Sequence, residues 1–125
     1  MRYVCLLHFD GKVLDAMTPD ELADLDARSL GYDDELKARG HLVVAQALQG
    51  PESAVLVKVR DGRMSATDGP YAETKEQLGG FVLIEARDLN EAIRLAAGIP
   101  LAKLGTIEVR PEYVIPGQEG RPSRT

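Results

Sequence analysis

Two segments of this chain carry residues that start a helix, and each of them lies between apolar runs. Thr18-Pro19-Asp20-Glu21 supplies a hydroxyl N-cap, a proline at the first helical position and the glutamate of a capping box. Asp88-Leu89-Asn90-Glu91 repeats this logic before an apolar face that ends at Gly98 and Pro100. Because apolar runs flank both helices, the sequence predicts a chain in which strands and helices alternate.

The first predicted helix covers residues 19–39. Its apolar side recurs at spacings of three and four residues, through Leu22, Leu25, Ser29, Tyr32 and Leu36. Gly40 follows the last helical residue, where glycine commonly ends a helix. Gly31 lies inside the helix and is a candidate interruption, because glycine lowers helix propensity.

Short apolar or alternating runs predict strands at 3–9, 41–48, 54–60, 63–67, 80–86 and 106–110. The run at 54–60 alternates, with valines on one side, which indicates a half-buried strand. Asp61-Gly62 then predicts a tight hairpin turn into the short strand at 63–67. Residues 10–16 are predicted to form a loop, and residues 49–53 a turn.

The order of these elements is the split β-α-β pattern of a ferredoxin-like α+β fold, with an extra small hairpin. Such a fold has an antiparallel sheet with two helices on one face and leaves the other face open. A second copy is the simplest cover for that face, so we expect a homodimer of the dimeric α/β-barrel type. We also expect a single domain over residues 1–112 and a loose C-terminal tail at 113–125.

Composition restricts the classes of partner. No apolar run approaches the ~18 residues of a membrane span, so no membrane partner is expected. The net charge of −5 argues against nucleic acid, whose binding needs a basic face. The single Cys5 fits a reducing compartment, and the cytoplasm is the expected location. Because cofactor fingerprints, nucleophile motifs and metal-ligand spacings are missing, we predict neither a cofactor nor a metal site.

The charged connection at residues 68–80 is the candidate functional site, because long loops in compact domains are more often functional or disordered than filler. Asp68, Glu73, Lys75 and Glu76 can form a polar cluster in which a shifted pKa allows acid–base work. The alternative is an exposed loop, or a first helical turn, with weak ion pairs.

Other residues of this connection suit structural roles. Gly69 and Pro70 favour a turn, in which glycine permits a positive φ and proline fixes the next bond. Gly79-Gly80 indicates a β-bulge or a close backbone approach where the next strand begins. We expect the Tyr71 ring to anchor the loop in the core with its hydroxyl at the rim, and direct ligand contact is the alternative.

His8 and His41 are the only histidines of the chain. They come close together if the strands that carry them are neighbours, and proton transfer is then conceivable. Cys5 and His8 point to opposite faces of their strand, because their spacing is odd, and cannot easily share a metal. An ordinary, partly buried histidine is the alternative for each.

The segment from Thr67 to Phe81 reads TDGPYAETKEQLGGF and resembles the signature of the DGPF domain, a branch of the YCII-related family. The resemblance extends from Tyr3 to Pro111. It implies a small bacterial protein with a dimeric ferredoxin-like α+β fold, in a family whose biochemical function is largely unsettled. Because some members are encoded beside, or fused to, extracytoplasmic-function sigma factors, it also implies a regulatory setting with a functional link to a sigma factor.

Two positions depart from the family pattern. Tyr71 stands where the name motif has phenylalanine, which adds a hydroxyl to the same aromatic body. The broader family was proposed to be enzymatic partly because of a His–Asp pair on its first helix. A rough match of that helix places Ser29 and Ala38 at these positions, so the chemistry of the pair is not carried over.

Three functions follow from these observations. The first is a dimeric protein that binds an unknown small molecule in a cleft between sheet, helices and loop, through His8, Asp68, Tyr71, Glu73, Thr74, Lys75 and Glu76. The second is a cofactor-free acid–base enzyme, an isomerase, lyase or hydrolase, that uses Glu73, Lys75 or His41. The third is a protein-interaction module that works with a transcription factor.

Overall fold

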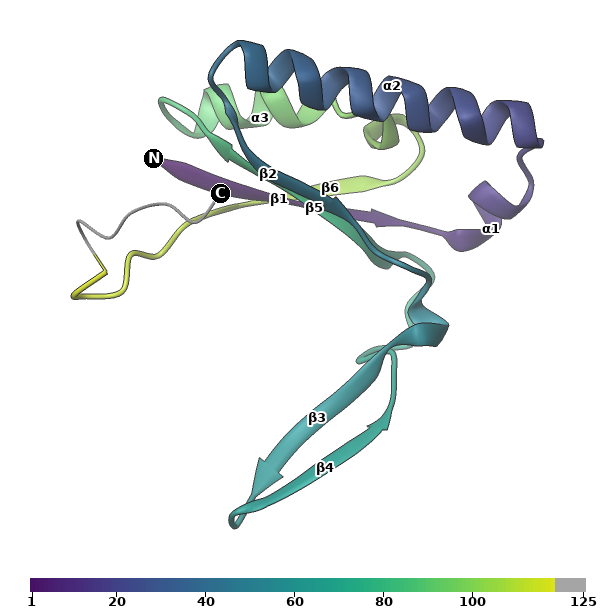
Figure 1. Ribbon diagram of the computed structural model, residues 1–125, viewed down its shortest axis with the longest axis vertical. Coiled ribbons are helices and arrows are strands. Elements are labelled where there is room, and N and C mark those ends of the chain that lie inside the picture. Colours follow the sequence, from purple (N-terminus) through teal and green to yellow (C-terminus); the bar gives the residue numbers. More distant parts are fainter. Residues whose placement is uncertain (119–125) are drawn as a thin grey trace.

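A four-stranded antiparallel sheet forms the base of the computed structural model, which describes residues 1–118 (Figure 1). Its strands follow the order β2 (Leu42–Ala47), β5 (Gln77–Glu85), β1 (Arg2–Phe9) and β6 (Thr106–Pro111). All neighbouring pairs in this sheet are antiparallel. This order, with the two later strands beside the first, confirms the predicted ferredoxin-like α+β fold.

Both predicted helices are present, as α2 (Pro19–Ala38) and α3 (Leu89–Ala97), and both cover the same face of the sheet (Figure 1). The capping box of α2 is formed, because the Thr18 side chain accepts from the Glu21 amide and the Glu21 carboxylate accepts from the Thr18 amide. Gly31 does not interrupt the helix. Packing on the sheet therefore outweighs its low helix propensity.

The core lies between these helices and the sheet. Alternate residues of β1 and β5 point into it, where they meet Leu36 of α2 and the apolar side of α3. Tyr32 lies at its edge and donates from its hydroxyl to the Leu95 carbonyl oxygen at 2.6 Å. Burial raises the pKa of this Tyr32 hydroxyl. Cys5 is fully buried in the same core, and burial raises the pKa of its thiol to about 11.

Three short helical segments lie outside the two predicted helices. The predicted loop at 10–16 contains α1 (Gly11–Asp15), whose N-cap is Asp10 with its carboxylate accepting from the Lys12 amide. The prediction was wrong because α1 buries no side chain and therefore has no apolar period to detect. The others are the 3₁₀ turns η1 (Pro51–Ser53) and η2 (Pro100–Lys103).

The predicted hairpin is formed by β3 (Val55–Arg60) and β4 (Arg63–Asp68), and we call it the arm. Asp61 and Gly62 both have positive φ, 51° and 73°, as the tight turn requires. The arm makes a separate two-stranded sheet and projects on the side of the main sheet away from the helices (Figure 1). The prediction that this strand is half-buried was wrong, because β3 is almost wholly exposed.

The connection after the arm is shorter than predicted, because β5 already begins at Gln77. The predicted irregularity at Gly79-Gly80 is confirmed by a shift in the register of β1 against β5, between Leu7 and His8. A side chain at Gly79 would collide with the Phe9 ring. Gly80 lies so close to β2 that an added Cβ would stand 2.8 Å from the Gln46 carbonyl oxygen.

The last strand ends at Pro111, and a short turn follows, in which the Gln118 amide donates to the Ile115 carbonyl oxygen at 2.8 Å. The predicted loose tail at 113–125 lies partly outside the described residues, since residues 119–125 are not described. Among residues 1–118, no helix has the length and apolar character needed to cross a membrane.

Candidate functional site

A cavity of about 550 Å³ lies at the end of the sheet from which the arm projects. One wall is the connection from β2 to β3 together with the start of β3, within residues 48–56. The other is the connection from β4 to β5 together with the start of β5, within residues 70–78. His8, at the end of β1, also lines it. The walls are mainly apolar, and the polar lining includes His8, Thr74, Glu76 and Gln77.

His8 is paired with a carboxylate of the neighbouring strand. Its Nε2 lies 3.0 Å from Glu108 Oε1, and the two side chains are 28% and 49% exposed. Leu6 faces Glu108 in the β1–β6 register and His8 faces Thr106, so His8 and Glu108 are diagonal neighbours on one face. Alternation along β1 turns His8 to the open face of the sheet, away from the buried Cys5.

A second carboxylate is held beside this pair. Thr106, which faces His8 across the β1–β6 ladder, donates from its hydroxyl to Glu76 Oε1 at 2.9 Å. Glu76 is half-buried and lines the cavity. Glu108 thus contacts the His8 imidazole directly, and Glu76 contacts Thr106, the residue that faces His8 across the ladder.

Gln77 holds the connection before β5 in shape. Its side-chain amide donates to the carbonyl oxygens of Ala72 and Thr74, each at 2.8 Å, and to the Thr74 hydroxyl at 3.1 Å. The Thr74 hydroxyl in turn donates to the Glu76 carbonyl oxygen at 2.7 Å. This local network fixes the wall of the cavity around Glu76, because one side chain satisfies several backbone groups that a loop leaves unpaired.

The foot of the arm closes tightly at Gly69. Its amide donates to the Ala54 carbonyl oxygen at 2.9 Å, and an added Cβ would stand 2.9 Å from the Ala54 Cβ. The reason for glycine here is this close approach, and the positive φ that the sequence suggested is not observed. The contact joins the two walls of the cavity at the point where both meet the arm.

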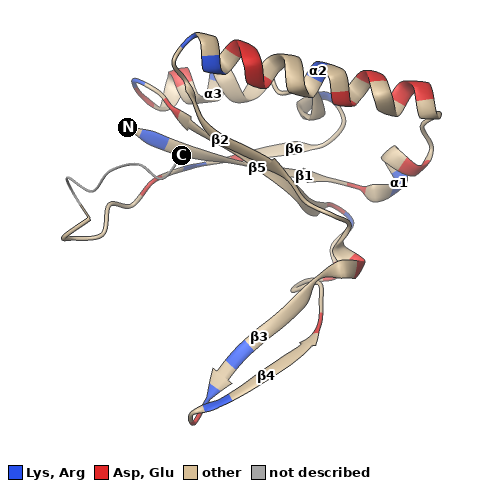
Figure 2. Cartoon of the chain, in the orientation of Figure 1, with Lys and Arg blue, Asp and Glu red and all other residues tan. Residues whose placement is uncertain are grey.

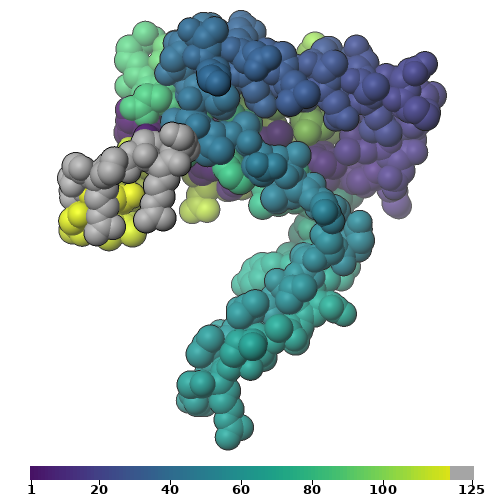
Figure 3. Space-filling model, viewed as in Figure 1, coloured from purple at the N-terminus to yellow at the C-terminus, as the bar shows by residue number. Residues whose placement is uncertain are grey.

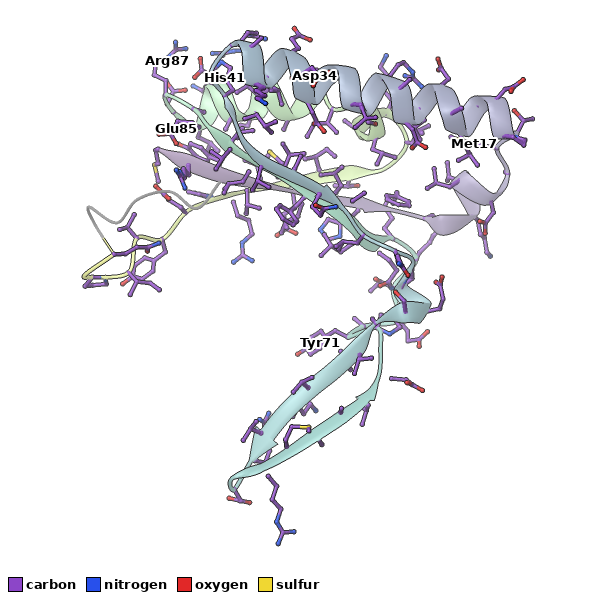
Figure 4. All side chains as sticks on the ribbon, viewed as in Figure 1. Met17, Asp34, His41, Tyr71, Glu85 and Arg87 are labelled. Atoms are coloured by element: carbon purple, nitrogen blue, oxygen red, sulfur yellow. The ribbon has the colours of Figure 1, made fainter. Side chains whose placement is uncertain are left out.

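The cavity brings together four of the predicted site residues, His8, Tyr71, Thr74 and Glu76. Tyr71 is 88% exposed, so the expectation that its ring anchors the loop in the core was wrong. It stands at the foot of the arm, outside the core, and contributes to the rim of the cavity (Figure 4). The loop is anchored instead by the Gly69–Ala54 contact and the Gln77 network.

The other predicted loop residues lie elsewhere. Asp68 is the last residue of β4 and faces Val55, and Glu73 is exposed and does not line the cavity. Lys75 is exposed and lines a neighbouring cavity of about 610 Å³ on the α1 side. Across residues 1–118, no ion pair joins Asp68, Glu73, Lys75 and Glu76 to one another.

His41 lies at the other end of the sheet, beside Glu85 and far from Tyr71 (Figure 4). Its Nδ1 donates to the Glu85 backbone carbonyl oxygen at 2.9 Å. The suggestion that His8 and His41 approach each other was wrong, because β5 lies between the strands that carry them. His41 does not line the cavity that contains His8.

Sequence reasoning missed Glu108, Thr106 and Gln77. The alternation of the last strand did place Thr106 and Glu108 on one face, but their position beside His8 depends on the register of β6 against β1. Gln77 lies inside the predicted connection, and only the folded loop shows that its amide binds the loop backbone. Within the part of the chain that the structure describes, no three His, Cys, Asp or Glu side chains are grouped to hold a metal ion.

The fold and this site define a small ferredoxin-like α+β protein with a histidine–carboxylate pair beside a cavity at the open face of its sheet. The chain belongs to the YCII-related family, because the sequence model of the YCII-related domain matches residues 1–115. It is 34% identical over 117 residues to an uncharacterised protein of Rhizobium meliloti (strain 1021), a match that covers 89% of this chain and 91% of the relative.

Among solved structures, the chain is similar to 5-chloro-2-hydroxyhydroquinone dehydrochlorinase (TftG) from Burkholderia phenoliruptrix AC1100, in complex with 2,5-dihydroxybenzoquinone. The TM-score is 0.57 and the sequence identity 18%, with 95% of this chain and 100% of the other chain covered. This likeness agrees with the ferredoxin-like fold.

Proposed function

We propose that this protein binds a small hydroxylated ring compound in the cavity beside His8 and carries out general acid–base chemistry on it. The observation that carries the proposal is the His8–Glu108 pair, 3.0 Å between Nε2 and Oε1, on the edge of a cavity of about 550 Å³. That volume lies within the range of roughly 300–1,000 Å³ typical of small-molecule sites.

His8 is the residue that moves the proton. In the neutral tautomer that donates from Nε2 to Glu108, Nδ1 carries the lone pair and has no hydrogen-bond partner among residues 1–118. It takes a proton from an acidic O–H or C–H group of the bound compound, and Glu108 stabilises the imidazolium that forms. Glu108 also orients the ring, as the third group of a nucleophile–base–carboxylate arrangement does.

The rest of the cavity favours a flat, hydroxylated ligand. Leu48, Leu56 and Leu78 supply apolar walls, and Glu76 supplies a carboxylate that accepts hydrogen bonds from hydroxyl groups. The structural neighbour supports this class of ligand, because its complex holds 2,5-dihydroxybenzoquinone. Its name, a dehydrochlorinase, denotes an elimination of HCl, a reaction in which a base removes a proton.

A thermal-shift screen of hydroxylated benzoquinones and hydroquinones, beginning with 2,5-dihydroxybenzoquinone, tests the binding site. A compound that binds only the folded protein raises the melting temperature by mass action. We expect Glu76→Gln and His8→Gln variants to lose most of the shift. The double variant Glu73→Gln, Lys75→Met is the control, and its shift stays unchanged because neither side chain lines this cavity.

Turnover of the compounds that bind, followed by absorbance, tests the chemistry. We expect His8→Gln to lower kcat by about 10²–10⁴-fold, the usual contribution of a positioned acid–base group. His41→Gln is the matched control, because its ring lies at the other end of the sheet, and its kcat stays within about twofold of wild type. Equal turnover in the two histidine variants would falsify the role of His8.

Binding without turnover is the second function that the cavity supports, since a walled cavity with polar groups suffices for a ligand-binding protein. Within the family, we place the chain in the DGPF branch on the run TDGPYAETKEQLGGF.

A further inference from the structure

The cavity beside His8 adjoins the second cavity, of about 610 Å³, on the α1 side. We call them the His8 cavity and the α1 cavity. They share lining residues from both walls, Leu48, Gln49, Gly50 and Pro51 after β2, and Gln77 and Leu78 at the start of β5. A cavity of about 150 Å³ already holds benzene, so a ring beside His8 leaves room for a substituent that extends into the α1 cavity.

The boundary between the two cavities is apolar. Leu48 and Leu78 line both of them and are 46% and 41% exposed, so each keeps apolar surface in water. The Phe9 ring lines the α1 cavity and lies against Gly79, where a side chain would collide with it. Beyond its foot, the arm stands apart from the body (Figure 3), and residues 57–68 line neither cavity. The open boundary therefore suits a short aliphatic chain, whose methylene groups cover apolar surface.

Lys75 and Glu76 are consecutive residues of one loop, yet they line different cavities. Glu76 lines the His8 cavity, and Lys75 lines the α1 cavity. The loop is held on both sides of Lys75. The Gln77 amide donates to the Thr74 carbonyl oxygen at 2.8 Å, and the Thr74 hydroxyl donates to the Glu76 carbonyl oxygen at 2.7 Å. Because adjacent Cα atoms are only about 3.8 Å apart, one anchored segment supplies a carboxylate to one cavity and an ammonium group to the other.

The charges of the α1 cavity restrict the ligand that it can hold. Among residues 1–118, neither Lys75 nor Lys12, the other lysine of this cavity, forms an ion pair. The cavity also contains the carboxylates of Asp10, Asp15 and Glu52, and Asp10 accepts from the Lys12 amide at 3.0 Å. Because these carboxylates repel a doubly charged phosphate, a single carboxylate is the anion that fits the unpaired ammonium group of Lys75.

We propose that the α1 cavity takes a carboxylate-bearing side chain of the ring compound, and that Lys75 binds this carboxylate and selects the substrates that carry it. This proposal rests on the proposed function, because it needs the ring beside His8. The aliphatic part of the side chain lies across Leu48 and Leu78, and its carboxylate pairs with the Lys75 ammonium group. We assign the pair to Lys75 because Lys12 belongs to α1, a helix that buries no side chain. The substrate class is therefore a hydroxylated ring with one short acidic side chain.

Isothermal titration calorimetry with matched ligand pairs tests this proposal. The ligands are 2,5-dihydroxybenzoic acid, 2,5-dihydroxyphenylacetic acid and 3-(2,5-dihydroxyphenyl)propanoic acid, each beside its primary amide, which has the same shape and no charge. We expect at least one acid to bind about fivefold more tightly than its amide, the effect of one partly exposed ion pair. The Lys75→Met variant should bind that acid and its amide equally.

Lys58→Met is the matched control, because it removes the same charge from a residue that lines neither cavity. Lys58 lies on the polar face of the arm, which also carries Arg60, Arg63, Ser65 and Thr67. Basic residues gather in the outer half of the arm (Figure 2). Because salt screens charges that lie far apart, the preference of this variant for the acid stays within about twofold of wild type. Circular dichroism shows that both lysine variants fold.

A ligand without a carboxylate separates this proposal from the proposed function. We expect 2,5-dihydroxytoluene to bind wild type and Lys75→Met equally and to bind His8→Gln more weakly. If acids and amides bind wild type equally while His8→Gln weakens both, the His8 site stands and the carboxylate subsite is overturned. A preference for the acid that survives in Lys75→Met, or that Lys58→Met also removes, overturns the subsite as well. If none of the compounds binds, both proposals fail.

Discussion

The body, made of the main sheet with α2 and α3, and the arm are both built on alternating apolar strands, yet their apolar side chains meet different environments. In the body, Cys5 and Ile84 are almost completely buried. In the arm, Val57 has the same alternating position and is 65% exposed. Alternation therefore predicts which side chains share a face, but whether that face is covered depends on elements elsewhere in the chain or in another molecule.

The largest expected difference between body and arm is in the free energy of unfolding. Leu36→Ala leaves a cavity in the core and lowers the free energy of unfolding by about 2–5 kcal/mol. Leu36 is 1% exposed and belongs to the core cluster. Val59→Ala in the arm changes the free energy of unfolding by less than about 0.5 kcal/mol when the chain is monomeric, because the Val59 side chain is already in water.

Urea unfolding, at a concentration where sedimentation shows only monomer, measures both variants. The slope of the free energy against urea must stay the same in both for the comparison to hold. A loss of more than about 1.5 kcal/mol in Val59→Ala would show that the arm packs on the body of its own chain.

Thiol labelling compares the two regions a second time. Burial raises the pKa of Cys5 from 9.0 to about 11, so at pH 8 its thiolate fraction is roughly 100-fold below that of an ordinary thiol. Ser65→Cys places a second thiol on the exposed polar face of the arm. We expect iodoacetamide to modify position 65 at least about 100-fold faster than Cys5, as followed by mass spectrometry. Comparable rates would mean that the body opens far more often than its packing indicates.

Much of the body could be predicted from the sequence, because local signals there agree with the final packing. In the body, Thr18 and Glu21 form the predicted capping box. In the arm, only the local turn at Asp61-Gly62 is where the sequence placed it. The exposure of the arm could not be predicted, because the strand at 54–60 has the pattern of a half-buried strand. That pattern is fully consistent with burial against another molecule.

Gln77→Ala is expected to act where arm and body meet. Without its three hydrogen bonds, the connection at 72–76 opens more readily, and its backbone amides exchange about tenfold faster. The melting temperature changes little, because the core is untouched. Gln46→Ala on β2 is the matched control and leaves the exchange at 72–76 unchanged. An identical exchange pattern in both variants would show that the loop does not need the Gln77 amide.

The smallest expected effects come from two carboxylates of the body and have opposite signs. The amide of Arg87 donates to Glu91 at 2.8 Å and lowers the pKa of that carboxyl below its ordinary 4.5. Its stabilisation is therefore present above pH 4.5 and is lost as the pH falls through the lower folded value. Glu91→Gln should lower the melting temperature at neutral pH, with a difference that vanishes in acid.

Asp33→Asn should change the melting temperature in the opposite direction to Glu91→Gln. Burial, with a smaller contribution from Asp34, raises the pKa of Asp33 above its ordinary 3.8. The charged form therefore destabilises the fold above that pH, and removing it raises the melting temperature at neutral pH but not in acid. Melting curves of both variants across the acid range measure the two signs side by side. The same sign for both would contradict the assignment of hydrogen bonding to one and burial to the other.

The candidate site was only partly predictable, for a reason that its residues make plain. His8, Thr74 and Glu76 were singled out because their residue types suit chemistry or binding. Glu108, which makes the pair with His8, lies 100 residues away in the sequence, on another strand. No local pattern contains the register that sets them side by side, and so the chemistry of the site appears only in the folded sheet.

The β-bulge at Gly79 has a consequence for how such a site changes in evolution. After Gly79 in the chain, the odd-numbered residues of β5, such as Phe81, lie on the face of the sheet opposite the helices, and before Gly79 the even-numbered Leu78 lies on that face instead. One extra residue thus resets the parity of the strand and decides that Leu78, opposite His8, stands on that face while Gln77 lies opposite Phe9. A lineage can therefore exchange the side chains beside His8 by gaining or losing a single codon here, with no substitution in the cavity.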